Sequence, residues 1–247
     1  MVTQTAKSFL IGCTLLAVVA EMVLPILPSY ATRYRPPSNM QRPAGRQGAA
    51  TRNDCVQNQF VFAPLVPRTN AGQTLAKRPT LYWYANHHSF TWARFELYAA
   101  PNLQPTLTPL YRKTFKLQGN EPLHRIALPR DTVPALTVGQ DYLWQVTLIC
   151  SSGGPDDDTA DGSQRMIRGW IRRVPPTAEL QTQISGFQRK YDGYAESGLW
   201  YDAIDNLAKR LRKHPQNAQF LSDWQDLVRE TSLDPNLFAV PSPNRQP

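Results

Sequence analysis

The sequence predicts a mainly β protein, in which an antiparallel sandwich is followed by a C-terminal cap of three helices. Three observations support this fold class. Between residues 60 and 174, short runs rich in β-branched and aromatic residues are separated by Pro, Gly and Asn. No helical periodicity interrupts these runs, which favours antiparallel sheets over alternating βα units. After Pro175-Pro176 the apolar residues adopt helical spacing instead.

Seven strands are expected, and they are Phe60–Val66, Thr80–Ala85, Thr91–Ala99, Leu110–Leu117, Leu123–Leu128, Tyr142–Cys150 and Arg165–Val174. The run that begins at Tyr142 is the clearest, because every second residue up to Cys150 is apolar. Gly139 stands three residues before Tyr142, which resembles the tyrosine corner of immunoglobulin-like and fibronectin-like sandwiches. In that corner the phenol hydroxyl bonds to the upstream backbone. An immunoglobulin/fibronectin-like sandwich is therefore expected.

Three helices are expected after Pro176, over residues 178–191, 200–213 and 220–228. The series Gly198-x-Trp200-x-x-Ala203, with Leu207 and Pro215, resembles half of a tetratricopeptide repeat. About three such repeats are needed for a stable array, so a single unit predicts helices packed on the sandwich.

The chain divides into a signal peptide (1–31), a disordered Pro/Arg-rich arm (32–54), the sandwich (55–176), the helical cap (177–234) and a disordered tail (235–247). The arm is assigned from its composition, since five arginines accompany prolines and glycines that cannot build a core. The linker at Pro175-Pro176 is too short and stiff to let the helices move independently of the sandwich.

The first 31 residues predict export. Lys7 precedes an apolar run, and the segment closes on Ser29-Tyr30-Ala31, a small-x-small cleavage site that would leave Thr32 as the first mature residue. One alternative is a retained membrane anchor, although the run is short and broken by Pro25. Another is lipidation at Cys13, although the apolar core follows this cysteine instead of preceding it. We therefore expect a periplasmic, envelope or extracellular location, with no membrane span after cleavage.

Two cysteines remain after cleavage, Cys55 and Cys150. In an oxidising compartment they are expected to form a disulfide. The bridge would close a loop of about a hundred residues, which contributes on the order of 4–5 kcal/mol in the chain-entropy model. The alternative is a pair of unbonded buried thiols.

The chain carries a net charge of +8, and much of the excess lies in the Arg-rich arm. An exported protein with a basic arm is expected to meet an anionic envelope surface, not nucleic acid. We expect a monomeric, non-enzymatic envelope module that acts in binding or assembly, with an envelope protein or polysaccharide as partner. Two alternatives stay open: a carbohydrate- or calcium-binding module, and a hydrolase with an unrecognised site.

The histidines are the natural candidates for catalysis, and they are His87, His88, His124 and His214. They are scattered along the chain, and the sequence contains neither a Gly-x-Ser-x-Gly elbow nor a His-Glu-x-x-His helix. No catalytic residue and no cofactor-binding residue is therefore assigned. A hydrolase would require a pocket around His87, His88 or His124.

A weak calcium motif lies before the last strand. Asp157-x-Thr159-x-Asp161-Gly162 follows the opening of a calcium loop, which makes Asp157 and Asp161 candidate metal ligands. The twelfth position is Arg168, where such loops carry a glutamate. The alternative is a solvated acidic loop, and no other cofactor is expected.

Three aromatic residues are predicted to point outward from the strands, and together they form a candidate binding surface: Trp92, Tyr98 and Trp170. Large exposed rings often mark a docking surface for sugars or proteins. The alternative is that the helices cover them, with Trp170 at the junction between helices and sheet.

Several spaced motifs carry a resemblance to a known family. They include Arg78-Pro79-Thr80-Leu81-Tyr82-Trp83-Tyr84, Val138-Gly139-Gln140-Asp141-Tyr142 and Gly198-Leu199-Trp200-Tyr201-Asp202-Ala203. Together they resemble the cyanobacterial exported family catalogued as domain of unknown function 928, over Cys55 to Leu237. The resemblance implies an exported single module and supplies no catalytic residues. The Asp-rich insertion Gly153–Ser163 is longer than the resemblance suggests.

Overall fold

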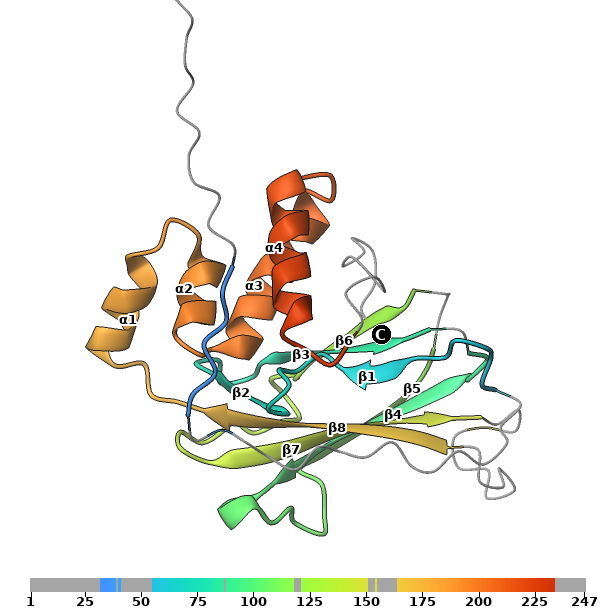
Figure 1. Cartoon of the computed structure of the whole chain (residues 1–247). Helices are drawn as coiled ribbons and strands as arrows, with labels where there is room; N and C mark the ends of the chain where they lie inside the picture. Colours follow the sequence, from blue (N-terminus) through green and yellow to red (C-terminus); the bar gives the residue numbers. More distant parts are fainter. Residues whose placement is uncertain are drawn as a thin grey trace, which may run out of the picture. The chain divides into compact units, whose positions relative to one another are not determined.

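The β-runs form two sheets in the computed structural model, which Figure 1 shows with the helices. The structure describes residues 32–38, 40, 55–86, 88–117, 121–150, 154 and 164–233, all of which fall in the compact unit Ala31–Pro247. One sheet has the order β1-β3-β6, with β1 at Phe62–Pro64, β3 at Thr80–Ala85 and β6 at Leu123–Ala127. The other has the order β2-β8-β7-β4-β5, with β2 at Ala71–Thr74, β8 at Gln164–Arg173, β7 at Asp141–Ile149, β4 at Trp92–Ala99 and β5 at Tyr111–Lys116. A short 3-10 turn, Pro101–Leu103, follows β4.

One strand was not predicted, and it makes the prediction of purely antiparallel sheets wrong. β2 pairs in parallel with β8, at the edge of the five-stranded sheet. Its sequence, Ala-Gly-Gln-Thr, is short and has low β-propensity, so it carries no strand pattern. Tertiary contact explains the strand: a Cβ on Gly72 would lie 2.8 Å from the Cβ of Trp200, so glycine lets a helix approach this edge closely.

The two sheets share one apolar core. The inner face of β7 contributes Tyr142, Trp144, Val146 and Leu148, and β4 contributes Ala93, Phe95 and Leu97. From the three-stranded sheet, the ring of Trp83 lies 6.2 Å from that of Phe115 on β5. The β7 residues are those whose alternation in the sequence predicts an inward face.

The turn before β7 contains the predicted tyrosine hydrogen bond. The backbone N–H of Thr137 donates to the hydroxyl of Tyr142 over 2.8 Å. Gly139 has φ of 83°, a conformation that few residues other than glycine adopt readily. Its N–H donates to the carbonyl of Arg173, which ties the turn to the end of β8.

The predicted disulfide is present. Cys55 and Cys150 are bonded, with their Cα atoms 6.0 Å apart and a sequence separation of 95. The bridge joins the segment before β1 to the residue that follows β7. It therefore connects the entry of the β-region to its most buried strand.

Four helices follow the sheets, where three were predicted. They are α1 (Ala178–Ser185), α2 (Lys190–Glu196), α3 (Trp200–Lys213) and α4 (Ala218–Arg229). The predicted first helix is divided after Ser185, and residues 186–189 separate α1 from α2. The two helices then approach closely, because a Cβ on Gly193 would lie 2.6 Å from the carbonyl oxygen of Ile184. Periodicity alone does not reveal such a break, since Ile184 and Tyr191 keep helical spacing across it.

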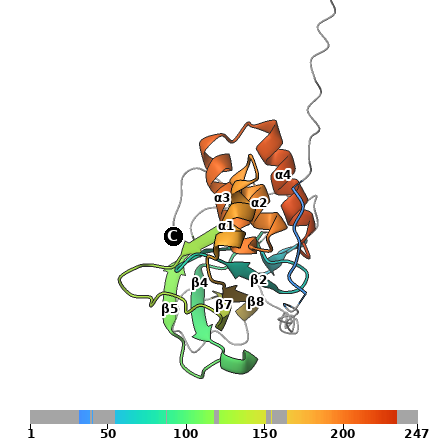
Figure 2. The same ribbon diagram turned by 90° about the vertical axis from the view of Figure 1, so that its left-hand side faces the viewer.

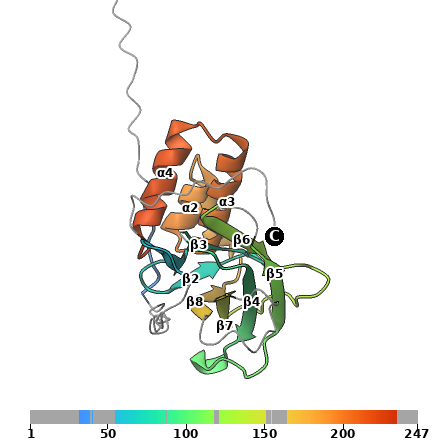
Figure 3. The same cartoon turned by 90° about the vertical axis from the view of Figure 1, so that its right-hand side faces the viewer.

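Helix α3 packs on β2 and β3, and α2 and α4 pack on α3, so the helices share the core of the sheets (Figures 1 and 3). The Nε1 of Trp200 donates to the carbonyl of Leu65 over 2.9 Å. The hydroxyl of Tyr201 donates to the carbonyl of Trp170 and accepts from the Nε1 of Trp144. The predicted role of the Trp170 ring at this junction is wrong: only its carbonyl takes part, because the side chain belongs to a second cluster with Met40 and Leu143.

The described part of the Pro/Arg-rich arm is packed, which corrects the prediction of disorder there. Thr32, Tyr34 and Met40 are buried. We name residues 32–38 the N-terminal strap; Figures 1 and 2 show it passing beside α2 and α4. Composition alone predicts disorder here, but a few buried side chains are enough to hold the segment in place once the helices supply partners. Among the described residues, no helix is both long and apolar enough to cross a bilayer.

Candidate functional site

The structure brings two of the candidate histidines, His88 and His124, close to each other. His87 lies outside the described residues, and His214 ends α3 next to Phe220. His88 and His124 lie near each other at one end of the sheets: the His124 ring stacks on Trp83 at 5.5 Å, and the His88 ring contacts Phe60 and Phe90. Burial, and to a smaller extent the neighbouring His88, lowers the pKa of His124 to about 4, and burial also lowers the pKa of His88. Both rings are therefore neutral at pH 7, among aromatic residues that offer no nucleophile.

The metal prediction cannot be placed, because Asp157 and Asp161 lie outside the described residues. Within the described ranges no group of three or more His, Cys, Asp or Glu side chains is arranged to hold a metal ion.

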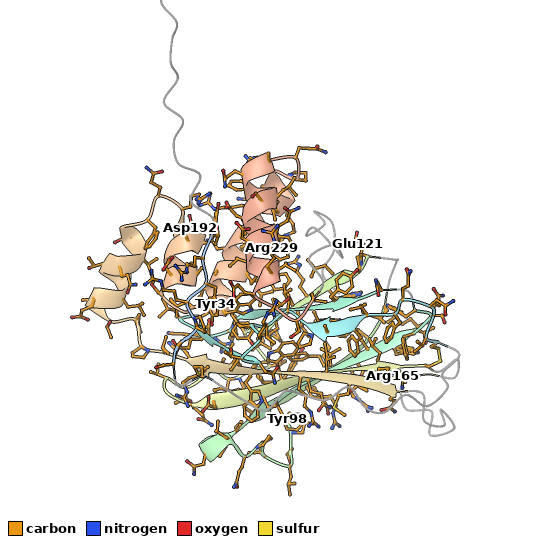
Figure 4. The ribbon with its side chains drawn as sticks, in the orientation of Figure 1. Tyr34, Tyr98, Glu121, Arg165, Asp192 and Arg229 are labelled. Carbon is orange, nitrogen blue, oxygen red and sulfur yellow. A yellow bond between two sulfur atoms is a disulfide. The ribbon has the colours of Figure 1, made fainter. Side chains whose placement is uncertain are left out.

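The three candidate surface aromatics do not gather into one patch. Trp92 and Tyr98 lie six residues apart on β4, about 20 Å along the strand. Tyr98 packs with Trp170, but Trp170 is only 6% exposed, since Met40 and Leu143 join the same cluster. Trp92 is half-buried and lies under the ammonium of Lys116, 5.2 Å from its ring centre. Figure 4 shows Tyr98 at the side of the five-stranded sheet remote from the helices.

The outer face of this sheet carries a satisfied polar network across four strands. Arg112 donates to Glu96 over 2.8 Å, Gln145 donates to the other oxygen of Glu96 over 3.0 Å, and Arg168 donates to Gln145 over 3.0 Å. Cross-strand pairs of this kind stabilise a sheet. These polar groups hydrogen-bond to one another and so stabilise the sheet. We therefore assign them no chemical role.

The most specific recognition among the described residues is that of the N-terminal strap by the helices. Thr32 and Tyr34 are buried while Arg33 and Arg35 are exposed, the alternation of an extended chain. The Tyr34 ring meets Trp200 edge-on, with ring centres 4.9 Å apart. In Figure 4, Tyr34 and Asp192 both lie along the strap, beside the helices.

Main-chain and charged contacts fix the register of the strap. The N–H of Arg35 donates to the carbonyl of Ala195 over 3.1 Å, and its guanidinium pairs with Glu196. A Cβ on Gly198 would lie 2.9 Å from the Cγ of Pro37, so the strap passes closely over this glycine. We name the surface formed by Asp192, Ala195, Glu196, Gly198 and Trp200 the strap-binding face.

A buried ion cluster lies at the upstream end of the strap. The Oγ1 of Thr32 donates to Asp192 over 2.7 Å, and Arg189 bonds to both Asp192 and Asp223. Asp223 is fully buried and also accepts from the hydroxyl of Tyr191 over 2.5 Å. Burial raises the pKa of Asp192 and of Tyr191. The cluster can bind cations and hydrogen-bond donors, and it lacks an activated nucleophile among the described residues.

Sequence reasoning did not identify the strap-binding face. The spacing Gly198-x-Trp200 was noted as repeat-like, but nothing in it indicates an occupant. One signal was available in the arm, where Thr32-Arg33-Tyr34-Arg35 alternates as a half-buried strand does.

A family model described as Domain of Unknown Function (DUF928) matches residues 47–241. The match covers well over half of the chain, and the chain belongs to this family. The resemblance predicted from its spaced motifs is thereby confirmed. A search of curated proteins finds none that matches.

Proposed function

We propose that this member of the DUF928 family is an exported, non-enzymatic binding module of the cell envelope, and that its helices recognise extended polypeptide. One observation carries the proposal: the strap-binding face holds residues 32–38 through a main-chain hydrogen bond, an aromatic anchor and an ion pair. Extended peptides are recognised by this combination, in which main-chain bonds supply affinity and alternate side chains supply specificity.

The proposal extends to the architecture. We regard α2 and α3 as a tetratricopeptide-like hairpin and the two sheets as a variant of the immunoglobulin-like sandwich. The close approach at Gly198 and the Thr137–Tyr142 hydrogen bond support these assignments. In this view the sandwich is the scaffold and the helices supply the recognition surface.

Export supports an envelope role. The cleavage pattern at Ser29-Tyr30-Ala31 and the Cys55–Cys150 bridge agree with an oxidising compartment. The strap would then be the first part of the mature chain, and it would occupy the strap-binding face until a partner segment displaces it.

A peptide titration tests this function. A fluorescent peptide with the sequence of residues 32–40 is added to the exported chain carrying Tyr34→Ala, which removes the anchor of the internal strap. We expect saturable binding, seen as a rise in anisotropy, and at least tenfold weaker binding to the wild-type chain. The control Tyr34→Phe keeps the ring and removes a hydroxyl that has no hydrogen-bond partner among the described residues, so it should behave as wild type.

A second substitution locates the binding. Glu196→Lys in the Tyr34→Ala chain reverses the charge that pairs with Arg35 and should weaken peptide binding. Equal, unsaturable signals for all chains would show that the helices do not recognise extended polypeptide.

A further inference from the structure

The buried ion cluster at Asp192 lies within reach of the main-chain nitrogen of Thr32. Thr32 is only 4% exposed, and its Oγ1 lies 2.7 Å from the Oδ1 of Asp192. Covalent geometry places the nitrogen of a threonine about 3 Å from its own Oγ1. The nitrogen of Thr32 therefore lies within about 6 Å of the Asp192 oxygen that accepts from its hydroxyl.

The charges around this point are two carboxylates, which attract a cation, and two guanidinium groups, which repel one. From α2 and α4 the cluster presents two carboxylates, Asp192 and Asp223, and both bond to the single guanidinium of Arg189. Arg210 of α3 lies over the ring of Tyr191, with its guanidinium carbon 5.8 Å from the ring centre. Burial raises the pKa of Asp192, so its ionised form has less stabilisation than it would have in water.

We propose that cleavage after Ala31 creates an α-ammonium group on Thr32 that pairs with Asp192 and fastens the N-terminal strap to the helices. The proposal rests on the export that is part of the proposed function. In the cleavage, water adds across the Ala31–Thr32 peptide bond: its oxygen goes to the carbonyl carbon of Ala31, and the nitrogen of Thr32 leaves as an amine. That amine takes up a proton in water, while the new carboxyl group of Ala31 releases one.

An order of events follows from the burial of Thr32. A peptidase cannot reach a bond next to a residue that is packed against α2, so cleavage precedes docking of the strap. Before cleavage the same nitrogen is a neutral amide, which a carboxylate attracts far less strongly than it attracts an ammonium. Processing thus converts a weakly held strap into a firmly held one, and it sets how readily another segment can take its place.

The pairing predicts a defined pH dependence. An α-amino group has an ordinary pKa of about 7.7–8.0, and pairing with Asp192 raises it in the folded state. The added stability is therefore present below about pH 7.7 and is lost as the pH rises through the raised value. Asp223 adds to the attraction, whereas Arg189 and Arg210 oppose it.

The experiment compares two forms of the same mature chain, one with a free amino group on Thr32 and one acetylated there. Each form is made with wild-type Asp192 and with Asp192→Asn, and melting temperatures are measured at pH 7 and pH 10. We expect the free form to melt about 2–4 °C above the acetylated form at pH 7. We expect this difference to disappear at pH 10 and in Asp192→Asn.

A matched control and the opposing results complete the test. Asp226→Asn removes a carboxylate on α4 that pairs with Arg229 and lies outside the strap-binding face, and it should keep the difference between free and acetylated forms. Equal melting temperatures at pH 7, or a difference that survives Asp192→Asn, would overturn the ion pair. An exported protein whose intact mass shows another first residue would overturn the processing step while leaving the peptide-binding function open to its own test.

Discussion

Asp202 occupies the first turn of α3, where its carboxylate meets the main chain that follows β2. It accepts from the N–H of Leu75 over 2.9 Å. Burial is nevertheless the larger influence and raises the pKa of Asp202 from 3.8 to about 6, and the hydrogen bonds with Leu75 and Thr74 only partly offset it. This contact fastens α3 to β2, the one strand that sequence patterns did not predict. An individual side chain therefore combines a structural role with a sensitivity to pH.

Asp202→Asn should remove part of the pH dependence of stability. Because folding raises this pKa, the folded state holds the proton more tightly, so stability present below about pH 4 is lost as the pH rises through about 6. The loss amounts to about 2–3 kcal/mol. An asparagine keeps an oxygen acceptor for Leu75 but does not titrate, so the variant should not show this loss. Urea unfolding between pH 4 and pH 8 measures the effect.

The control for this substitution is Asp226→Asn on α4, where the carboxylate pairs with Arg229 near the surface. It should leave the slope of stability against pH as in wild type. If Asp202→Asn also keeps the full wild-type dependence of stability on pH, titration of this carboxylate does not cause that dependence.

At the scale of elements, the contact between α1 and α2 decides how the helical layer begins. Thr177 caps α1 by accepting from the N–H of Leu180, as its sequence position predicts. The division after Ser185 comes from packing, since Gly193 allows α2 to lie directly against the carbonyl of Ile184. The strap-binding face is built on this arrangement, because Ala195 and Glu196 follow on the same short helix.

Gly193→Ala should destabilise the protein although alanine favours helix formation by about 1 kcal/mol. The new Cβ would lie 2.6 Å from a backbone oxygen that cannot move freely, so we expect a net loss of about 1–3 kcal/mol. Gly186→Ala is the matched control, because its nearest neighbour would be 3.4 Å away. Thermal unfolding measures both, and equal melting temperatures for the two variants would contradict the packing argument.

At the scale of the whole described unit, the Cys55–Cys150 disulfide is a covalent bond that closes a long loop of the chain. A loop of 95 positions corresponds to about 4–5 kcal/mol in the chain-entropy model. We expect the double variant Cys55→Ser/Cys150→Ser to unfold at a lower denaturant concentration by that order of free energy. The wild-type chain after reduction is the control and should match the double variant; stability unchanged by either treatment would contradict the estimate.

Local patterns predicted much of this fold. The alternation in Tyr142–Cys150, the tyrosine turn, the bonded cysteine pair and the apolar stripes of α3 and α4 all follow from spacing and residue type. The strand, the turn and the helices are predictable because a residue's own side chain and its near neighbours supply the driving force, whereas the disulfide is predictable because only two cysteines remain after cleavage. The family was predicted separately, from the resemblance of several spaced motifs, and the family match confirms it.

Long-range contact decided the remainder. β2 is a strand because β8 and Trp200 lie beside it, and α1 and α2 are separate helices because Gly193 meets Ile184. The strap is ordered because Asp192, Ala195 and Trp200 bind it from more than 150 positions away. Weak local propensity leaves such segments undetermined in the sequence, and the free energy that orders them comes from surfaces that exist only after the chain has folded.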